Sequence, residues 1–500
     1  IVDKLNNIVG KIENNIENKV TNYFPLYSNL NTLYQRVNFA SNKLLFKDVP
    51  IKTNSDGEYI FYDKVNEFYY LTNKYSDEEL DARLEKQVKF FNELSNKGIN
   101  VSIYIPTRYE FTELKENERW NIECGKHYFV TRNDSSLIAF TIPENGIEKI
   151  HILTSHSDSP TFKIKENPEI EVEKHYVKLN VEKYGGMLCA PWFDRPLSVA
   201  GRVIIKDKTS GQFTSKLVNI DRDLAMIPNL AIHMNREINS GYNYNAQKDL
   251  LPLYSCGSPK ETFMEQIAEA AGVEKDEILG HDLFLYNRQE GSVWGASKEF
   301  ISSGRLDDLQ CAFASLQGFL SGEKKECMAV HCVLDNEEVG SGTKQGAAST
   351  FLFDTLIRVH EALGYDGEDY RVHLADSFMI SADNAHAVHP NYTEKADPTN
   401  RPYLNEGIVL KFNANQKYCT DAVSAAMFRD LCKRADVPVQ TFTNRSDMAG
   451  GSTLGNISNT QVALNTVDIG LPQLAMHSPY ETAGVKDTEY LVRAAKEFFC

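Results

Sequence analysis

Long apolar runs are missing from this sequence. A membrane-spanning helix needs about 18 consecutive apolar residues, and the longest candidates, such as residues 327–334, have only the length of a strand. Residues 1–15, IVDKLNNIVGKIENN, are too polar for the apolar region of a signal peptide. We therefore expect a soluble protein with no membrane partner.

Paired cysteines and an excess of basic charge are also missing. The nine cysteines are an odd number and lie singly, without a C-x-x-C pair. This pattern argues against a disulfide framework and is typical of reduced thiols in the cytoplasm. The chain carries 53 Lys and Arg against 69 Asp and Glu, a formal net charge of −16. Because a nucleic-acid binder needs a basic surface, we expect a cytoplasmic protein with no nucleic-acid partner.

From about residue 111 the sequence shows the alternation typical of α/β proteins. Helical patterns cover residues 305–320 and 487–499. Short apolar runs that end in polar residues predict strands, and they occur at 149–160, 327–342, 372–386 and 467–478.

Two regions differ from this alternation. Residues 1–108 are rich in Asn, Lys and Tyr, with a helix predicted at 76–97 and a strand at 100–106. Residues 166–295 contain alternating segments and loops rich in Asn, Pro and Gly, which predict a mainly β insertion. The main domain would then consist of two parts, 109–165 and 296–500.

Histidines and carboxylates gather after the predicted strands. Because open α/β sheets place their sites at the carboxyl ends of strands, we expect these side chains to lie close together. They are His156, Asp158, Glu337, Glu338, Asp383 and His477, with Asp307 just before the predicted helix. Imidazole and carboxylate ligands without cysteine suit Zn²⁺, Mn²⁺ or Co²⁺ in a hydrolytic site. This set is large enough to hold two ions that share one carboxylate.

Each of these signals also has a structural explanation. A single histidine at a strand end is more often hydrogen-bonded within the fold than bound to a metal. The pair Asp307 and Asp308 also complements a helix dipole, and adjacent glutamates such as Glu337 and Glu338 are usually solvated. The glycine-rich segment 340–346 matches neither the dinucleotide-binding pattern nor a P-loop. Spacing alone therefore leaves a dinuclear metal site and structural roles both open.

Several longer blocks carry more information because they occur in a fixed order. They are HSDSP (156–160), YGG and WFDRPLSVAGRV (184–203), IPNLAIHMNRE (227–237), RLDDLQ (305–310), DNEEVGSG (335–342), SADNAHAVHPNY (381–392), GIVLKFNANQKY (407–418), GGSTLGNI (450–457) and VDIGLPQLAMHS (467–478). Together they resemble the aspartyl aminopeptidase family, which includes vacuolar aminopeptidases. The resemblance covers about residues 109–500 and does not extend to 1–108.

The resemblance implies a fold and an assembly. The fold class is α/β, a three-layer α/β/α sandwich with a mixed sheet like that of zinc peptidases, carrying an inserted mainly β domain at 166–295. In the family such an insertion serves oligomer contacts, so a homo-oligomer is expected, a dodecamer by resemblance. The resemblance also implies a cis peptide bond between Asp307 and Asp308.

The resemblance further assigns roles to individual residues. Two divalent ions are expected, zinc first, with manganese or cobalt as alternatives. The implied metal ligands are His156 and Asp383 for one ion, Glu338 and His477 for the other, and Asp307 between them. Glu337 corresponds to the general base, and Asp158 to the carboxylate that orients an imidazole. Near the substrate, the resemblance implies His386 as an oxyanion contact and Lys411, Tyr418 and Met476 as substrate-binding residues.

The implied activity is that of a metalloaminopeptidase, which removes N-terminal amino acids from peptides through a water held between the ions. The resemblance also implies a preference for acidic N-terminal residues, because in acid-preferring members a lysine at the position of Lys411 pairs with the substrate's side-chain carboxylate. Other readings stay open: a preference for neutral residues such as Leu, a metal-dependent deacylase or carboxypeptidase, or a non-catalytic assembly protein. Asp308, Pro196 and the segment 445–449 depart from the family pattern, which leaves the fine specificity open.

Overall fold

The computed structural model describes residues 111–499, apart from 209, 258–261, 323 and 325, and two short strands nearer the N-terminus. The chain divides into two units, Ile1–Arg108 and Tyr109–Cys500. In the first unit, β1 (Pro50–Thr53) pairs with β2 (Tyr59–Phe61) in antiparallel fashion. The helix predicted at 76–97 and the strand predicted at 100–106 lie outside the described residues.

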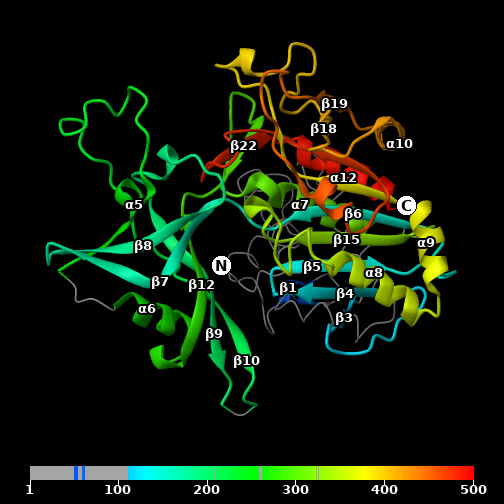
Figure 1. The fold of residues 1–500 in the computed structure, drawn as a ribbon, viewed down its shortest axis with the longest axis horizontal. Coiled ribbons are helices and arrows are strands. Elements are labelled where there is room, and N and C mark those ends of the chain that lie inside the picture. The colour runs from blue at the N-terminus through cyan, green and yellow to red at the C-terminus, as the bar shows by residue number, and fades with distance from the viewer. Residues whose placement is uncertain are drawn as a thin grey trace. The chain divides into compact units, whose positions relative to one another are not determined.

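A nine-stranded mixed sheet forms the centre of the second unit (Figure 1). Its central strands are parallel and buried on both faces, which is why their sequences are nearly continuous apolar runs. In spatial order the strands are β19 (Val439–Phe442), β18 (Ile408–Lys411), β20 (Asn465–Gly470), β16 (Phe378–Ala382), β6 (Ile150–His156), β15 (Met328–Leu334), β5 (Ser136–Thr141), β4 (His127–Arg132) and β3 (Phe111–Leu114).

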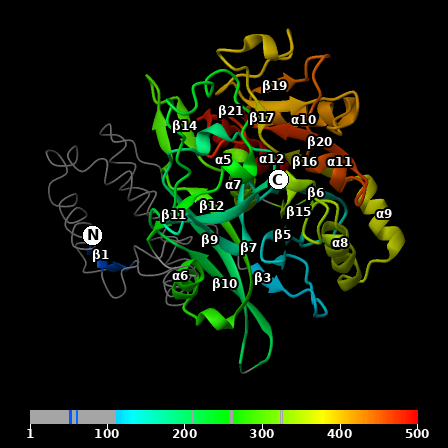
Figure 2. The ribbon, with the colours of Figure 1, turned by 60° about the vertical axis from the view of Figure 1, so that its left-hand side comes forward.

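Helices cover both faces of this sheet. On one face, α7 (Leu306–Ser321), α10 (Ala422–Arg434) and α12 (Asp487–Phe498) contribute to one apolar core. On the other face, α8 (Phe351–Ala362), α9 (Gly367–Ala375) and α11 (Leu454–Ser458) contribute to a second core. Figures 1 and 2 show α8 and α9 on the opposite side of the strands from α10 and α12. The three-layer α/β/α class predicted from the sequence is confirmed.

The sequence predicts most of these elements at their observed places. The helices expected at 305–320 and 487–499 are α7 and α12. The run 372–386 is different, because its first residues belong to helix α9 and the rest form two strands, Phe378–Ala382 and the two-residue Ala385–His386. The Asp366 side chain caps α9, and polar residues occupy most of that helix, so its apolar residues did not reveal it as a helix.

A separate six-stranded antiparallel sheet lies on the left of Figure 1 and has its own apolar core, against which α6 packs. Its strands alternate between buried and exposed residues, as in β8. The elements of this layer are β10 (Phe213–Asn219), β9 (Leu197–Lys206), β12 (Ile278–Asn287), β7 (Thr161–Val172), β8 (Tyr176–Tyr184), β11 (Leu253–Cys256), α5 (Ala246–Asp249) and α6 (Thr262–Ala271).

A five-stranded sheet joins segments that are distant in sequence. Its order is β13 (Ser292–Trp294), β14 (Phe300–Ser303), β22 (Glu481–Gly484), β21 (Pro472–Leu474) and β17 (Ala385–His386). Strand β14 leads directly into α7, while β21 and β22 flank the turn that contains His477. This sheet therefore brings residues near 307 and 477 together. Among the described residues, no helix is long and apolar enough to span a membrane.

Candidate metal centre

The parallel strands β6 and β16 place two of the expected ligands at one edge of the sheet. His156 is the last residue of β6, and Asp383 directly follows β16. In the parallel register Ser381 pairs with Thr154, so both ligands lie two residues beyond the same pair. The His156 Nε2 atom lies 3.7 Å from Asp383 Oδ1.

Asp307 lies between two imidazoles. Its Oδ1 is 3.4 Å from His156 Nε2, and its Oδ2 is 3.6 Å from His477 Nε2. Asp307 and Asp308 have non-helical backbone angles although they begin α7, and the peptide bond between them is cis, as the resemblance implied. This geometry directs the Asp307 carboxylate into the site, with one oxygen toward each histidine.

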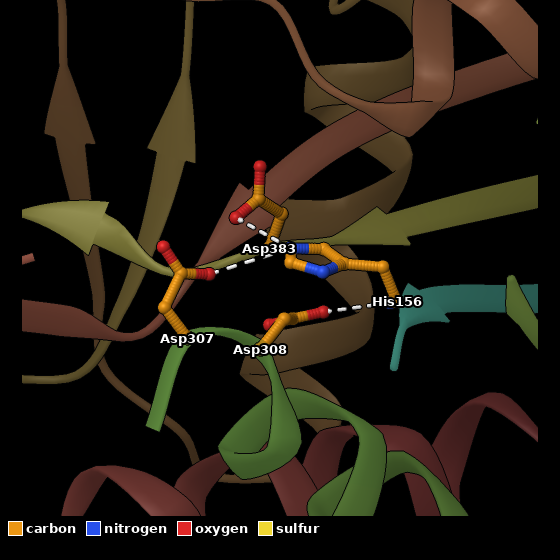
Figure 3. Close-up of side chains that lie close together, drawn as sticks. All are labelled: His156, Asp307, Asp308 and Asp383. Carbon is orange, nitrogen blue, oxygen red and sulfur yellow. Dashed lines mark hydrogen bonds and ion pairs between the residues drawn. The ribbon is translucent and has the colours of Figure 1, made fainter. Parts of the chain in front are cut away.

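The half of the site around His156 is buried, and we refer to it as the buried half. Figure 3 shows the side chains of His156, Asp307, Asp308 and Asp383 pointing toward one another. Asp308 Oδ2 accepts a hydrogen bond of 3.0 Å from the His156 backbone N–H. Burial opposes a charge on His156, but Asp308 and the other surrounding carboxylates raise the pKa of His156 well above its ordinary value.

The half around His477 is more open, and we refer to it as the open half. His477 Nε2 lies 3.3 Å from Glu338 Oε2. Glu337 and Glu338 begin a short 3₁₀ turn (Glu337–Val339) just after β15, while His477 lies in the turn between β21 and β22. Loops therefore supply the ligands of this half, with the exception of Asp307, which both halves share.

Asp158 organises the residues around it through its carboxylate. Its Oδ1 accepts a hydrogen bond of 3.0 Å from the Glu337 N–H, and its Oδ2 accepts one of 3.2 Å from the Glu338 N–H. The Tyr184 hydroxyl donates to Oδ2 at 2.7 Å. His156 Nδ1 lies 3.1 Å from the Asp158 carbonyl and 3.4 Å from its Oδ1, so Asp158 also directs Nε2 of that imidazole into the site.

The chemistry of this cluster fits divalent cations. Asp307 Oδ1, Asp308 Oδ1 and Glu338 Oε1 are buried without a hydrogen-bond partner among the residues that the structure describes. Burial, reinforced by Asp383, raises the pKa of Glu337 to about 8, and burial with Asp307 raises that of Glu338 to about 10. Bound cations would be coordinated by these oxygens and would offset the repulsion between the neighbouring carboxylates. The donors are oxygen and nitrogen only, which suits Zn²⁺, Mn²⁺ or Co²⁺.

Two of the expected substrate residues lie beside the buried half. Lys411 ends β18 and is buried; its Nζ donates to the Asn384 carbonyl at 2.9 Å and lies 3.5 Å from Asp383 Oδ2. The same Nζ is 5.4 Å from the centre of the Tyr418 ring. Burial opposes the charge on Lys411, but Asp383 outweighs burial and raises the pKa of Lys411.

The other two expected residues have no such contacts. His386 lies at the edge of the five-stranded sheet, exposed, with its ring 6.1 Å from that of Phe442. Met476 is half-buried in the turn beside His477. Among the described residues, neither side chain forms a hydrogen bond or ion pair with the proposed ligands.

Sequence reasoning missed several residues that support the site. Glu481 accepts hydrogen bonds from the backbones of Asp307 and His477. The Thr453 hydroxyl donates to Asp383 Oδ2 at 2.7 Å. Thr453 belongs to the GGSTLGNI block, and Glu481 comes four residues after His477, but neither position shows in the sequence which ligand it contacts.

Comparison with known proteins identifies the family. Residues 104–499 match the model of the "Aminopeptidase I zinc metalloprotease (M18)" family. The chain belongs to the M18 aminopeptidase family. A "Probable M18 family aminopeptidase 2" from Clostridium novyi is 46% identical over 431 residues, which cover 83% of this chain and 100% of that protein. The predicted family resemblance is confirmed, and the protein is a metal-dependent aminopeptidase.

Solved structures of this family resemble the fold. In the structure of an Ape4 and Nbr1 complex, one chain is 36% identical, with a TM-score of 0.75 over 78% of this chain and 79% of that chain. The S. cerevisiae mApe1 dodecamer is 28% identical, with a TM-score of 0.69 over 82% of this chain and 92% of that chain. An M18 aminopeptidase architecture therefore holds the candidate metal centre described above.

Proposed function

We propose that this aminopeptidase uses two zinc ions, one in each half of the metal centre. His156 and Asp383 would hold the first ion, Glu338 and His477 the second, and Asp307 would be shared by both. The observation that supports this proposal most strongly is the Asp307 carboxylate, whose two oxygens face two different imidazoles at 3.4 and 3.6 Å. The buried carboxylate oxygens without partners support it as well.

The chain's own residues then account for the proton transfers of peptide hydrolysis. Two divalent ions, when bound, supply a water of lowered pKa and polarise the scissile carbonyl. Glu337 is half-buried and forms no ion pair with another described residue, so its carboxylate is available to take the proton from the water and give it to the leaving amine. Asp158 holds the Glu337 backbone and the His156 ring, which fixes both relative to the substrate. His386 is proposed to contact the carbonyl oxygen.

We propose a preference for acidic N-terminal residues on the basis of Lys411. A buried ammonium beside Tyr418 provides a counter-charge for a substrate carboxylate, and Met476 would form part of the same pocket. The 3.5 Å contact between Lys411 and Asp383 favours a second role, because it makes the lysine a partner of a metal ligand. A lysine used only in that way would leave the enzyme with a neutral, Leu-type preference.

Initial rates on Asp, Glu, Leu, Lys and Ala amides test the proposal, with Zn²⁺, Mn²⁺ or Co²⁺ and after chelation. We expect chelator-sensitive cleavage led by Asp and Glu. Lys411→Met should lower kcat/KM for the Asp amide about 100-fold, since it removes a hydrogen-bonded charge partner, and should lower that for the Leu amide less than about 10-fold. Lys417→Met is the matched control, because Lys417 is an exposed lysine of the same segment.

The outcomes test the proposed acidic preference and the proposed aminopeptidase reaction separately. Leu-led cleavage, or equal losses on both amides in Lys411→Met, would keep the metalloaminopeptidase and overturn the acidic pocket. If the metal-loaded enzyme cleaves no amide, the proposed aminopeptidase mechanism is contradicted and a deacylase or carboxypeptidase reaction should be tested instead.

We further propose that the protein is a homo-oligomer whose contacts involve the β insertion, 166–295. Large apolar side chains are exposed there, including Phe213, Leu217 and Met234 at 69%, 83% and 70%. A related structure is described as a dodecamer. Sedimentation velocity should give one large species for the wild type and smaller species for Leu217→Asp. A monomeric wild type would contradict the proposal.

A cytoplasmic location is proposed from the cysteines. No disulfide joins the eight cysteines among the described residues, which suits a reducing compartment. Activity in the soluble fraction of lysed cells, and its absence from the medium and the membranes, would support this location; secretion would contradict it.

A further inference from the structure

Glu481 connects Asp307, which both halves share, with His477 of the open half. It is the first residue of β22 and only 2% exposed. Its Oε2 accepts a hydrogen bond of 3.0 Å from the Asp307 N–H, and its Oε1 accepts one of 2.7 Å from the His477 N–H. Gln473 donates a longer bond, 3.5 Å, to Oε1. One buried carboxylate therefore holds the backbones of two residues that are far apart in sequence.

The backbone at both ligands needs such support. His477 has a φ of 66°, in the left-handed region that is unfavourable for a residue with a side chain. Its carbonyl accepts a hydrogen bond from the Leu188 N–H at 3.1 Å, and the Asp307 carbonyl accepts one from the Ser159 hydroxyl at 2.6 Å. Glu481 accepts the hydrogen bond from the N–H of each ligand. The backbone N–H and the backbone carbonyl of Asp307 and His477 are therefore all hydrogen-bonded.

We propose that Glu481 is a positioning residue that sets the separation of Asp307 and His477 and thereby the affinity of the open half for its ion. This inference rests on the proposed two-ion function. Glu481 touches the ligands through their backbone N–H groups and not through the ligand atoms. It therefore acts on the ion through Asp307 and His477.

The buried half has supports of its own. The His156 N–H donates to Asp308, and Asp383 is held by the Thr453 hydroxyl and by Lys411. The structure shows no contact of Glu481 with the His156 or Asp383 side chains. Removing one acceptor oxygen of Glu481 should therefore weaken binding of the ion in the open half first and leave the other ion in place.

The test uses Glu481→Gln in the full-length protein. The variant keeps the shape of the side chain but replaces one acceptor oxygen by an NH₂ group, which cannot accept from an N–H. Zinc binding is measured by competition with a chromophoric chelator, and kcat is measured at limiting and at saturating free zinc. We expect two ions in the wild type and, in Glu481→Gln, one ion bound as before and one bound about 10–100-fold more weakly. Saturating zinc should restore kcat.

Asp487→Asn is the matched control. Asp487 is also a fully buried carboxylate, and it also accepts two backbone N–H groups, from Asn405 at 2.7 Å and Gly407 at 3.3 Å. These bonds are to a loop and not to the proposed ligands. The variant should bind both ions like the wild type. If Glu481→Gln does not fold, Glu481→Asp replaces it, since the shorter carboxylate can reach only one of the two N–H groups.

The outcomes distinguish a failure of the inference from a failure of the proposed two-ion function on which it rests. Wild-type zinc affinities in Glu481→Gln would overturn the inference alone, as would a loss of kcat that saturating zinc does not restore. Equal weakening of both ions would overturn it as well. A wild type that binds fewer than two ions would overturn the proposed two-ion function, and the inference with it.

Discussion

The two halves of the metal centre achieve the same kind of ligand set in different ways. In the buried half, the His156 and Asp383 side chains are 1% and 13% exposed, and both lie at the ends of parallel strands. In the open half, the His477 side chain is 34% exposed and lies in a turn. Sheet register therefore positions the first pair, whereas hydrogen bonds to carboxylates position the second.

This difference shows where stability and function are coupled. Without bound metal, the buried half places carboxylates in a low-dielectric interior, so each needs a counter-charge, which Lys411 and the His156 imidazolium provide. In the open half His477 contacts solvent, whereas Glu338 is buried, and the half depends on supports such as Glu481 and Asp158 for its geometry. Changes in the first half should therefore affect folding, and changes in the second should affect mainly metal binding.

Asp307→Asn should have the largest effect, because Asp307 is the residue that both halves share. The Asn side chain has an NH₂ group in place of one carboxylate oxygen, so it lacks an acceptor that faces one imidazole. Loss of a residue that hydrogen-bonds to a metal ligand lowers metal affinity by up to roughly 100-fold. We expect both zinc affinities of Asp307→Asn to fall by more than this, with a parallel loss of activity. Titration of zinc against a chelator checks this, and retention of either affinity would show that Asp307 is not shared.

Glu337→Gln should separate chemistry from metal binding. The variant cannot accept a proton, so kcat should fall about 10²–10⁴-fold, while the zinc content stays at the wild-type value because Glu337 is not a proposed ligand. Zinc analysis of the purified variant and initial rates on the amide panel measure both quantities. Unchanged activity would remove Glu337 as the base.

His156→Ala and His477→Ala compare the halves directly in metal-free protein. Loss of His156 leaves Asp307 and Asp383 buried without their imidazolium partner and should lower the free energy of unfolding by about 3–5 kcal/mol. Loss of the half-exposed His477 should lower it by less than about 1 kcal/mol. Urea denaturation in the presence of a chelator measures both, and equal costs would contradict the distinction drawn between the halves.

Asp487 offers a buried carboxylate outside the metal centre. Burial raises its pKa from 3.8 to about 7. Above pH 4 the unfolded chain releases this proton while the folded chain retains it, so the contribution of Asp487 to stability falls as the pH rises toward about 7 and is constant above it. Asp487→Asn should therefore gain on the order of 3–4 kcal/mol relative to wild type between pH 4 and 8. Urea denaturation of both proteins across this range checks it, and a pH-independent difference would contradict it.

The sequence named candidate ligands for both halves, but it explains the position of one pair more directly than that of the other. Polar residues that follow apolar strands revealed His156 and Asp383, because parallel strands share one edge. The separation of Asp307 and His477 depends on how β14, β21 and β22 pair, and pairing between such short, distant strands leaves no local pattern. The same reason hid Glu481, whose role exists only after the turn and the start of α7 have come together.

The sequence predicted the elements that have a clear apolar pattern and missed an element that lacks one. Apolar runs and helical spacing gave the α/β/α sandwich, α7 and α12, since burial produces their periodicity. Helix α9 was missed because its residues are mostly polar and its start depends on the cap at Asp366. A helix cap of that kind produces a weaker sequence pattern than a buried apolar face does.

The central claim, that two ions occupy two differently built halves around Asp307, is tested most directly by diffraction at the zinc absorption edge from crystals of the zinc-loaded protein. The account predicts two anomalous peaks in each metal centre, one among His156, Asp307 and Asp383 and the other among Asp307, Glu338 and His477. A single peak, or peaks that do not contact Asp307, would contradict it.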